Sequence, residues 1–297
     1  MNVSKRALEL ARRKFCIPAI LPARTAPSQN QPSCSPAEDL QLLPSFLVIG
    51  PPRTATGWLH EVLKQHALLP CSVKETRFFD SYFHRGLSWY LAHYPSERDQ
   101  RPVGEVAPTY FASGPARERI ASLIPKAKVV CIFRDPVERV LSLYRLKRAY
   151  GMVPWSFEQA LTRDPELTES SKYASNLKAW QHALGYKQVL ATFFEDLETA
   201  PQPYLDRVVD FIGVPRFTLA PSQITRVFSS ENMTLPRNHR RTRRATRIAE
   251  WFKAQRLGKV VMAVKKSPMI KLFLGGGPAF TEVSREGLPA LVRSLPS

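Results

Sequence analysis

The sequence is poor in acidic residues and lacks any regular arrangement of cysteines. It has 25 Asp and Glu residues against 43 Lys and Arg, which gives a formal net charge of +18. This charge favours anionic partners, and a nucleotide, a polyanionic acceptor, nucleic acid and a membrane surface all fit it. Its four cysteines, Cys16, Cys34, Cys71 and Cys131, form no C-x-x-C pair, and none has a histidine at metal-ligand spacing. We therefore expect no disulfide framework, no structural zinc and a buried thiol at Cys131.

The sequence also lacks a signal-peptide core and an uninterrupted apolar run long enough to span a bilayer. Residues 1–22 are basic and fit an amphipathic membrane-surface helix, a transit peptide or an ordinary frayed extension. Residues 23–37 are rich in Pro, Ser and Gln and are typical of a linker. Residues 260–274 are apolar but interrupted by Lys and Pro, which suits a peripheral or buried helix. We expect a cytoplasmic protein, with peripheral membrane contact through the basic termini as a further option.

The stretch from Phe46 to Leu59 predicts a strand, a tight loop and a helix. Residues 46–49 are apolar, Gly50-Pro51-Pro52 breaks the strand, and apolar residues recur at helical spacing after Thr56. Such a loop directs backbone N–H groups to a helix N-terminus and so forms an anion site, to which Arg53 adds a guanidinium.

This loop lacks the defining residues of a nucleoside-triphosphate P-loop, G-x-x-x-x-G-K-[ST]. Counted from Gly50, Ala55 takes the second glycine position, Thr56 the lysine position and Gly57 the Ser/Thr position. The lysine and the Mg²⁺-binding hydroxyl are both absent, which disfavours ATP or GTP. On this stretch alone, an ordinary turn of an α/β protein stays open as an alternative.

A second stretch, residues 128–145, predicts a buried strand followed by a capped helix. Arg134 lies at the carboxyl end of this strand, where ligands bind in open α/β sheets, and its planar fork suits a phosphate. Capping does not explain Arg134 together with Ser142, two turns into the helix. The N-cap, the first helical position and the capping-box acid are Asp135, Pro136 and Glu138.

Both stretches resemble the cofactor motifs of sulfotransferases, which use 3′-phosphoadenylyl sulfate (PAPS). The first resembles the 5′-phosphosulfate loop G-x-[PR]-[KR]-[ST]-G-T-[TS], from which Ala55 and Gly57 depart. The second matches the 3′-phosphate motif R-D-P-x-x-R-x-x-S-x-[YW] at every stated position. The resemblance implies that the N–H groups of residues 54–58 hold the phosphosulfate and that Arg134 and Ser142 bind the 3′-phosphate. The implied cofactor residues are Arg53, Thr54, Ala55, Thr56, Gly57, Trp58, Arg134 and Ser142, with Arg237 from a C-terminal basic cluster as a further candidate.

The segment from Lys74 to Asp80 is similar to E-x-x-F-F-[DN] of the heparan sulfate N- and 3-O-sulfotransferases, and residues 86–90 look like their G-x-x-W-Y. The resemblance implies that Glu75 is the catalytic base and that Lys74 and Arg77 face the acceptor. Without the resemblance, Glu75 would be interpreted as a solvated acid beside core aromatic residues.

Residues 103–111 resemble the pattern E-K-[ST]-[PA]-x-Y-F of the same enzymes. Glu105 matches, but Val106 replaces the lysine. Because charge that develops in the transition state still needs a cation, we expect Arg53 to carry more of that load. We also expect Val106→Lys to rescue part of the loss caused by Arg53→Ala.

The predicted fold is α/β with three layers, a mainly parallel central sheet and flanking helices around a P-loop-like strand, loop and helix. Strands are expected near 46–49, 71–74, 103–106, 128–133 and 188–193. The resemblance covers roughly residues 46–214. It implies a sulfotransferase domain at 40–235, between a basic extension and linker (1–39) and a basic C-terminal helical region (236–297).

The resemblance implies transfer of a sulfuryl group from PAPS to an acceptor hydroxyl or amine, on a carbohydrate that is itself anionic or neutral. The co-product would be adenosine 3′,5′-bisphosphate, and no metal or nucleic acid would take part. Two alternatives stay open. A P-loop kinase would require ATP and Mg²⁺, whereas a basic nucleic-acid-binding protein would bind phosphates with a steep dependence on salt.

Overall fold

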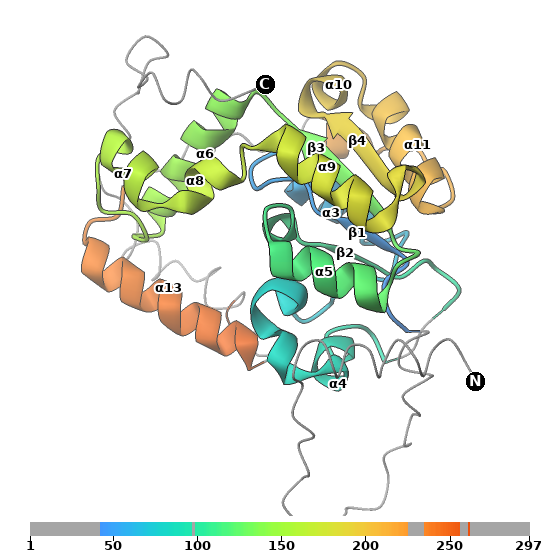
Figure 1. Cartoon of the computed structure of the whole chain (residues 1–297), viewed down its shortest axis with the longest axis horizontal. Coiled ribbons are helices and arrows are strands. Elements are labelled where there is room, and N and C mark those ends of the chain that lie inside the picture. The colour runs from blue at the N-terminus through green and yellow to red at the C-terminus, as the bar shows by residue number, and fades with distance from the viewer. Residues whose placement is uncertain (1–41, 97–98, 225–234, 256–260, 262–297) are drawn as a thin grey trace, which may run out of the picture.

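The computed structural model describes residues 42–96, 99–224, 235–255 and 261, and a four-stranded parallel sheet forms its centre (Figure 1). Phe46 pairs with Gly104 on one side and with Lys128 on the other, and Val129 pairs with Val189. The predicted parallel sheet is confirmed. The strands, in the order β2-β1-β3-β4, are β1 (Phe46–Val48), β2 (Gly104–Val106), β3 (Lys128–Phe133) and β4 (Val189–Phe193).

The strand expected at 71–74 is wrong. The Cys71 N–H donates to the His93 carbonyl at 2.8 Å, and the Ser72 hydroxyl lies 2.5 Å from His93 Nδ1. These contacts tie the segment to the chain that follows α4 (Leu87–Leu91), so its backbone is not available to the sheet. Pairing near this edge is instead a single parallel bridge between Leu68 and Val103.

Helices cover both faces of the sheet, because successive strand residues alternate between two hydrophobic clusters. Leu47 and Cys131 belong to the first cluster, with α5 and α9, and Val48 and Ile132 belong to the second, with α3, α10 and α11. The predicted three layers are therefore present, and the Cys131 thiol is buried as expected. The layer helices are α3 (Thr56–Leu63), α5 (Gly114–Leu123), α9 (Tyr173–Leu184), α10 (Phe194–Thr199) and α11 (Pro201–Ile212).

Beyond the carboxyl end of β3, α6 (Pro136–Ala149) leaves the sheet and packs with α7 (Phe157–Arg163) and α8 (Pro165–Glu169) in a third cluster (Figure 1). The predicted cap is confirmed, since Asp135 Oδ1 accepts the Glu138 N–H at 2.9 Å. The Asp135 N–H donates to Glu195 Oε1 at 3.2 Å. In a capping box, the Glu138 carboxylate would accept the Asp135 N–H. Here the Glu195 carboxylate of α10 accepts it instead.

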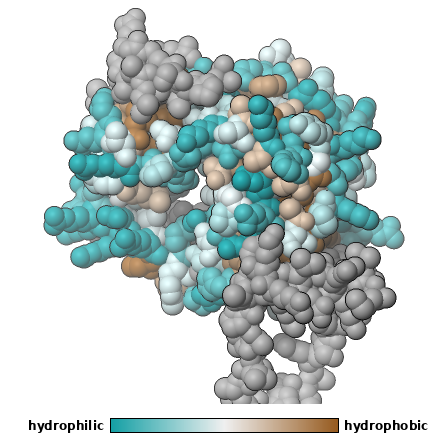
Figure 2. Space-filling model, in the orientation of Figure 1, coloured by the Kyte–Doolittle hydropathy of each residue, from teal (hydrophilic) through white to brown (hydrophobic). Residues whose placement is uncertain are grey.

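The basic helix α13 (His239–Ala254) packs against the loop that follows α6. Thr246 Oγ1 donates to the Tyr150 carbonyl at 3.0 Å. Gly151 has a φ of 66° and approaches the backbone of α13, where an added Cβ would lie 2.9 Å from the His239 carbonyl oxygen. Hydrophilic residues gather over the side of the molecule where α7 and α13 lie (Figure 2). The exposed arginines of α13 are Arg240, Arg241, Arg243, Arg244 and Arg247.

Shorter turns complete the described chain. They are η1 (Phe78–Tyr82), η2 (Phe83–Arg85), η3 (Pro108–Tyr110), η4 (Tyr186–Gln188) and α12 (Pro221–Ile224). Within the described residues, no helix combines the length and apolar character needed to cross a membrane. Residues 1–22 and nearly all of 260–274 lie outside the described residues, and the expected division at 39 and 235 stays a prediction.

Gly104 lies so close to the Phe46 ring that a Cβ at position 104 would overlap it. Both residues are buried in paired strands, so Gly104→Ala should destabilise the protein by about 1–3 kcal/mol through overpacking. Urea denaturation measures this change. Gly114→Ala is the matched control, because its added Cβ would meet its nearest neighbour only at 3.9 Å. Equal stabilities for the two variants would contradict this packing argument.

Candidate active site

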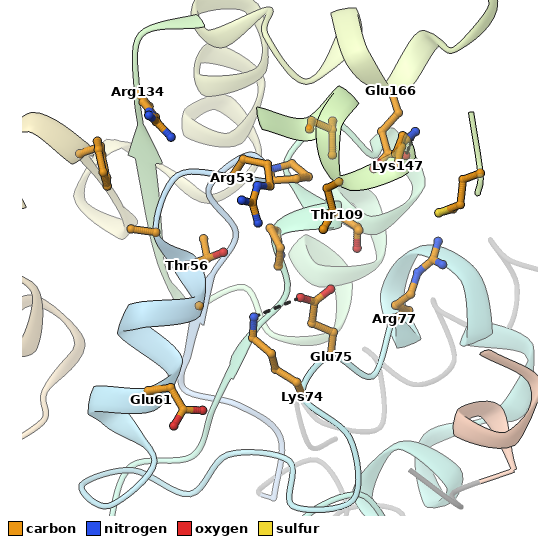
Figure 3. Close-up of a pocket in the computed structure, with 18 residues that line it drawn as sticks. Arg53, Thr56, Glu61, Lys74, Glu75, Arg77, Thr109, Arg134, Lys147 and Glu166 are labelled. Carbon is orange, nitrogen blue, oxygen red and sulfur yellow. Dashed lines mark ion pairs between the residues drawn. The ribbon is translucent and has the colours of Figure 1, made fainter. Parts of the chain in front are cut away.

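A cavity of about 550 Å³ lies at the carboxyl ends of β1, β2 and β3 (Figure 3). Ligands bind at this edge of open parallel sheets, because the loops that leave neighbouring strands converge there. The cavity combines positive and negative side chains from the loop after β1, the segment 74–77, α3, β3 and the region of α6 to α8. The charged lining residues are Arg53, Glu61, Lys74, Glu75, Arg77, Arg134, Lys147 and Glu166.

Most of the residues that the sequence predicted for the site line this cavity. The Thr54 hydroxyl instead donates to the Pro51 carbonyl at 2.8 Å. The Trp58 ring is buried in the second hydrophobic cluster, and Arg237 is exposed on the chain before α13. Ser142 is buried behind Arg53. The predicted residues that line the cavity are Arg53, Ala55, Thr56, Gly57, Lys74, Glu75, Arg77 and Arg134.

The loop after β1 turns sharply because two of its residues adopt left-handed backbone conformations. Arg53 has a φ of 78°, and Ala55, the N-cap of α3, has a φ of 65°. A side chain in this conformation costs about 1 kcal/mol or more, which is why glycine is usual there. The Ala55 carbonyl accepts the Trp58 N–H at 2.9 Å. That N–H, which the prediction assigned to the anion, is therefore engaged within α3.

The N–H groups of residues 54–57 are the remaining predicted donors in the loop and at the start of α3. No acceptor among the described residues takes a hydrogen bond from them. A helix N-terminus with such donors favours an anion, since both the N–H groups and the helix dipole are positive there.

Arg53 joins the two predicted phosphate motifs. Its Nε donates to Ser142 Oγ at 2.8 Å, across 89 residues of sequence. Burial, and then the charge of Arg134, lower the pKa of the Arg53 guanidinium from its ordinary value. Arg134 lies over the Phe194 ring, 4.7 Å from its centroid. Two guanidinium groups therefore face one small, partly buried space, which favours a ligand with more than one phosphate or sulfate.

Glu75 lies across the cavity from Arg53, and Figure 3 shows both side chains pointing into the same space. The carboxylate pairs with the neighbouring ammonium, with 3.7 Å between Lys74 Nζ and Glu75 Oε1. Arg77 lines the far wall and pairs with Asp80 at 3.6 Å. The predicted base and the two predicted acceptor contacts thus share one wall, opposite the loop.

Lys147, which no sequence motif predicted, is buried in the cavity wall. Its Nζ lies 2.6 Å from both Asp164 Oδ2 and Glu166 Oε2, so α6 is held to α8 by ion pairs. Lys147 shares a stripe with Leu143 and Leu146 that lines the cavity. These three positions have helical spacing, and this spacing is the sequence signal that could have placed Lys147 at the cavity.

Val106 is fully buried in the second hydrophobic cluster, on the face of the sheet that α3 covers. Lysine at this position would carry its charged group through an apolar region, which costs free energy unless the group is paired. Val106→Lys would therefore change the stability of the protein as well as add a cation, so the expected rescue does not test the effect of the charge alone. Lys74 and Arg77 already line the cavity and are candidates to supply the charge.

The fold and the cavity define an α/β protein with a charged cavity at the carboxyl edge of a parallel sheet. Residues 83–218 match the model of the sulfotransferase family. The chain is 32% identical over 195 residues to the human bifunctional heparan sulfate N-deacetylase/N-sulfotransferase 3, which covers 58% of this chain and 22% of that protein. The type 2 enzyme from Bos taurus is 28% identical over 198 residues, covering 59% of this chain and 22% of its own length.

A solved sulfotransferase from Alicyclobacillus acidocaldarius has the same fold, with a TM-score of 0.53 and 21% identity. The likeness covers 74% of this chain and 96% of that one. The match of residues 83–218 to the sulfotransferase family model confirms the resemblance to sulfotransferases that the motifs predicted. The chain spans about a fifth of the length of the curated relatives that it matches.

Proposed function

We propose that this protein transfers a sulfuryl group from PAPS to an acceptor hydroxyl or amine. The observation that carries the proposal is the hydrogen bond from Arg53 Nε to Ser142 Oγ, which brings both predicted phosphate motifs to one cavity. A nucleotide with anionic groups at both its 5′ and 3′ positions requires two such sites close together. The family match supports the same function.

The residues present suit the phosphates of PAPS. The helix N-terminus at 55–57 and the Arg53 guanidinium would hold the 5′-phosphosulfate, because both favour negative charge. Arg134 and Ser142 would hold the 3′-phosphate, with Arg134 supported by its stacking on Phe194. The described residues contain no group of three His, Cys, Asp or Glu side chains placed to bind a metal ion, and a metal-free reaction stays a prediction.

In the transfer step, the acceptor oxygen or nitrogen attacks the sulfur in line. Its new bond to sulfur forms as the bond from sulfur to the 5′-phosphate oxygen breaks. Glu75 takes the acceptor proton, and Arg53 stabilises the charge that develops on the leaving phosphate. The products are a sulfated acceptor and adenosine 3′,5′-bisphosphate. Both residues named for the step, Glu75 and Arg53, line the cavity.

We infer a carbohydrate acceptor from the relatives, whose names specify heparan sulfate N-sulfotransferase activity. Lys74 and Arg77 line the wall that carries Glu75 and would bind anionic groups of such an acceptor. The cytoplasmic location and the peripheral membrane contact stay predictions.

Adenosine 3′,5′-bisphosphate should raise the melting temperature, because a ligand that binds only the native state stabilises it. Adenosine 5′-phosphate should raise it much less, since it cannot contact Arg134 and Ser142. Scanning fluorimetry over a titration of each nucleotide measures the two shifts, and Ser142→Ala should narrow their difference. Equal shifts would remove the basis for the 3′-phosphate site. A shift with ATP and Mg²⁺ alone would favour the kinase alternative.

Glu75→Gln should lower kcat by about 100-fold or more, because the amide cannot accept the acceptor proton. Its affinity for adenosine 3′,5′-bisphosphate should stay near that of the wild type. Steady-state kinetics and calorimetry give the two values. The matched control is Glu61→Gln, which changes another carboxylate of the same cavity, one that pairs with Lys64 at 2.5 Å. Glu75 is not the base if its variant keeps most of the turnover.

Arg53→Ala should reduce transition-state stabilisation by about 3–4 kcal/mol, the typical loss when one preorganised donor is removed. Arg53→Lys should restore only part of it, because an ammonium lacks the fork that contacts Ser142. Comparison of kcat/KM with wild type measures the loss. Arg216→Ala, at an exposed arginine paired with Asp210, is the control. A loss below about 1 kcal/mol would assign the charge to another cation, with Lys74 and Arg77 next to test.

A further inference from the structure

Glu105 is a buried carboxylate on β2, one residue before the position where the family lysine is missing. The side chain is fully inaccessible to solvent. Glu105 Oε1 accepts the Thr76 N–H at 3.0 Å and the Thr76 hydroxyl at 2.5 Å. Glu105 Oε2 accepts the Tyr90 hydroxyl at 2.8 Å, and the Tyr110 hydroxyl lies 3.3 Å from both oxygens.

These partners include no positive charge. Among the ion pairs of the described residues, none involves Glu105, and its donors are three hydroxyl groups and one backbone N–H. A buried carboxylate without a cation is costly unless hydrogen bonds satisfy it, and an apolar residue of similar size would fill the same space at lower cost. The carboxylate therefore needs an explanation beyond packing, and its two bonds to Thr76 supply one.

Thr76 is the buried residue between two residues that line the cavity. Its exposed fraction is 3%, whereas Glu75 and Arg77 on either side both face the cavity. Arg77 has a φ of 54°, so the chain turns sharply where η1 begins. The Thr76 hydroxyl also accepts the Phe78 N–H at 3.1 Å. The direction in which Glu75 points is thus set by how the Thr76 backbone is held.

We propose that Glu105 is a positioning residue for the transfer step, because its carboxylate fixes the backbone at Thr76 and thereby directs Glu75 into the cavity. The inference rests on the proposed role of Glu75 as the base. A displacement of about 1 Å at a catalytic group can cost on the order of 100-fold in rate. Loss of this anchor should therefore lower kcat and leave nucleotide affinity unchanged.

The anchor should also respond to pH. Burial raises the pKa of Glu105 to about 7, against the opposing effect of the hydrogen bonds from Thr76, Tyr90 and Tyr110. The pKa values of Tyr90 and Tyr110 lie well above their ordinary range, first because these side chains are buried. Two further groups face this network, Tyr94 behind Tyr90 and Asp80 near Tyr110.

When Glu105 takes up a proton, one of its oxygens becomes a hydrogen-bond donor, although the surrounding N–H and hydroxyl groups are themselves donating to this carboxylate. Protonation therefore weakens the hydrogen bonds that hold Thr76. The Glu105 contribution to kcat should therefore fall as the pH falls through about 7. Stability should change in the opposite direction. Because the folded pKa is raised above the ordinary value of 4.5, the native protein holds a proton that the unfolded chain has released. The stability from this group is present below pH 4.5 and is lost as the pH rises to about 7.

The test uses Thr76→Val, which removes the hydroxyl but keeps the shape of the side chain. We expect kcat to fall by about 10- to 100-fold, with the Kd of adenosine 3′,5′-bisphosphate within about twofold of wild type, and Thr76→Ser to restore most of the turnover. The matched control is Thr192→Val, which removes another buried threonine hydroxyl, one that donates to the Cys131 carbonyl at 3.1 Å. An unchanged kcat in Thr76→Val, or an equal loss in Thr192→Val, would overturn the proposal.

Glu105→Gln supplies the pH readout. The variant should have low turnover throughout and should lack the step near pH 7 that wild type shows in kcat. If kcat falls with decreasing pH in the same way in wild type and in Glu105→Gln, the proposal is contradicted. Hydrogen exchange of the backbone amides in residues 74–79 measures how firmly this segment is held, and it needs no assay of sulfuryl transfer. If wild type fails to transfer sulfate, the proposed function is wrong, but faster exchange in Thr76→Val would still support the anchor and unchanged exchange would overturn it.

Discussion

The site depends on the parallel pairing of β1 between β2 and β3. The Ile49 N–H donates to the Val130 carbonyl at 2.9 Å, so β1 stays against β3 to its very end. Gly50 follows, where an added Cβ would lie 2.5 Å from the Ile132 backbone nitrogen. A side chain at this position would separate the two strands. Because Gly50 has none, the loop after β1 starts beside the loop after β3, and Arg53 can reach Ser142.

The same sheet edge holds the third part of the site. β2 pairs with β1 on its other side and carries Glu105, whose carboxylate binds the Thr76 segment. Three neighbouring strands therefore each position one component: the helix N-terminus with Arg53, the Arg134 motif, and Glu75. The overall basic charge contributes little to this arrangement, since the cavity also contains Glu61, Glu75 and Glu166. Five exposed arginines lie on α13, at the sequence positions given above.

The parallel sheet and the helices that follow β1 and β3 could be predicted from the sequence, because apolar strands and helix caps leave local patterns. The phosphate-binding roles of the residues between them come from the resemblance to sulfotransferases and stay predictions. The segment 71–74 could not be predicted, since its backbone is held by His93, more than 20 positions away, and not by a strand. The burial of Val106 depends on which face of β2 each residue takes, and a three-residue strand gives little periodicity. The ion pairs of Lys147 could not be predicted either, because its partners, Asp164 and Glu166, come from a later part of the sequence.

The proposed reaction moves a sulfuryl group from PAPS to a carbohydrate in this cavity. The most direct measurement is mass spectrometry of desulfated heparan oligosaccharides incubated with the protein and PAPS. The acceptor should gain sulfuryl groups while adenosine 3′,5′-bisphosphate appears in equal amount, and Glu75→Gln should slow this reaction by about 100-fold or more. Intact PAPS and unchanged acceptors, carrying both free hydroxyls and free amines, in the presence of folded protein that binds the nucleotide would contradict it.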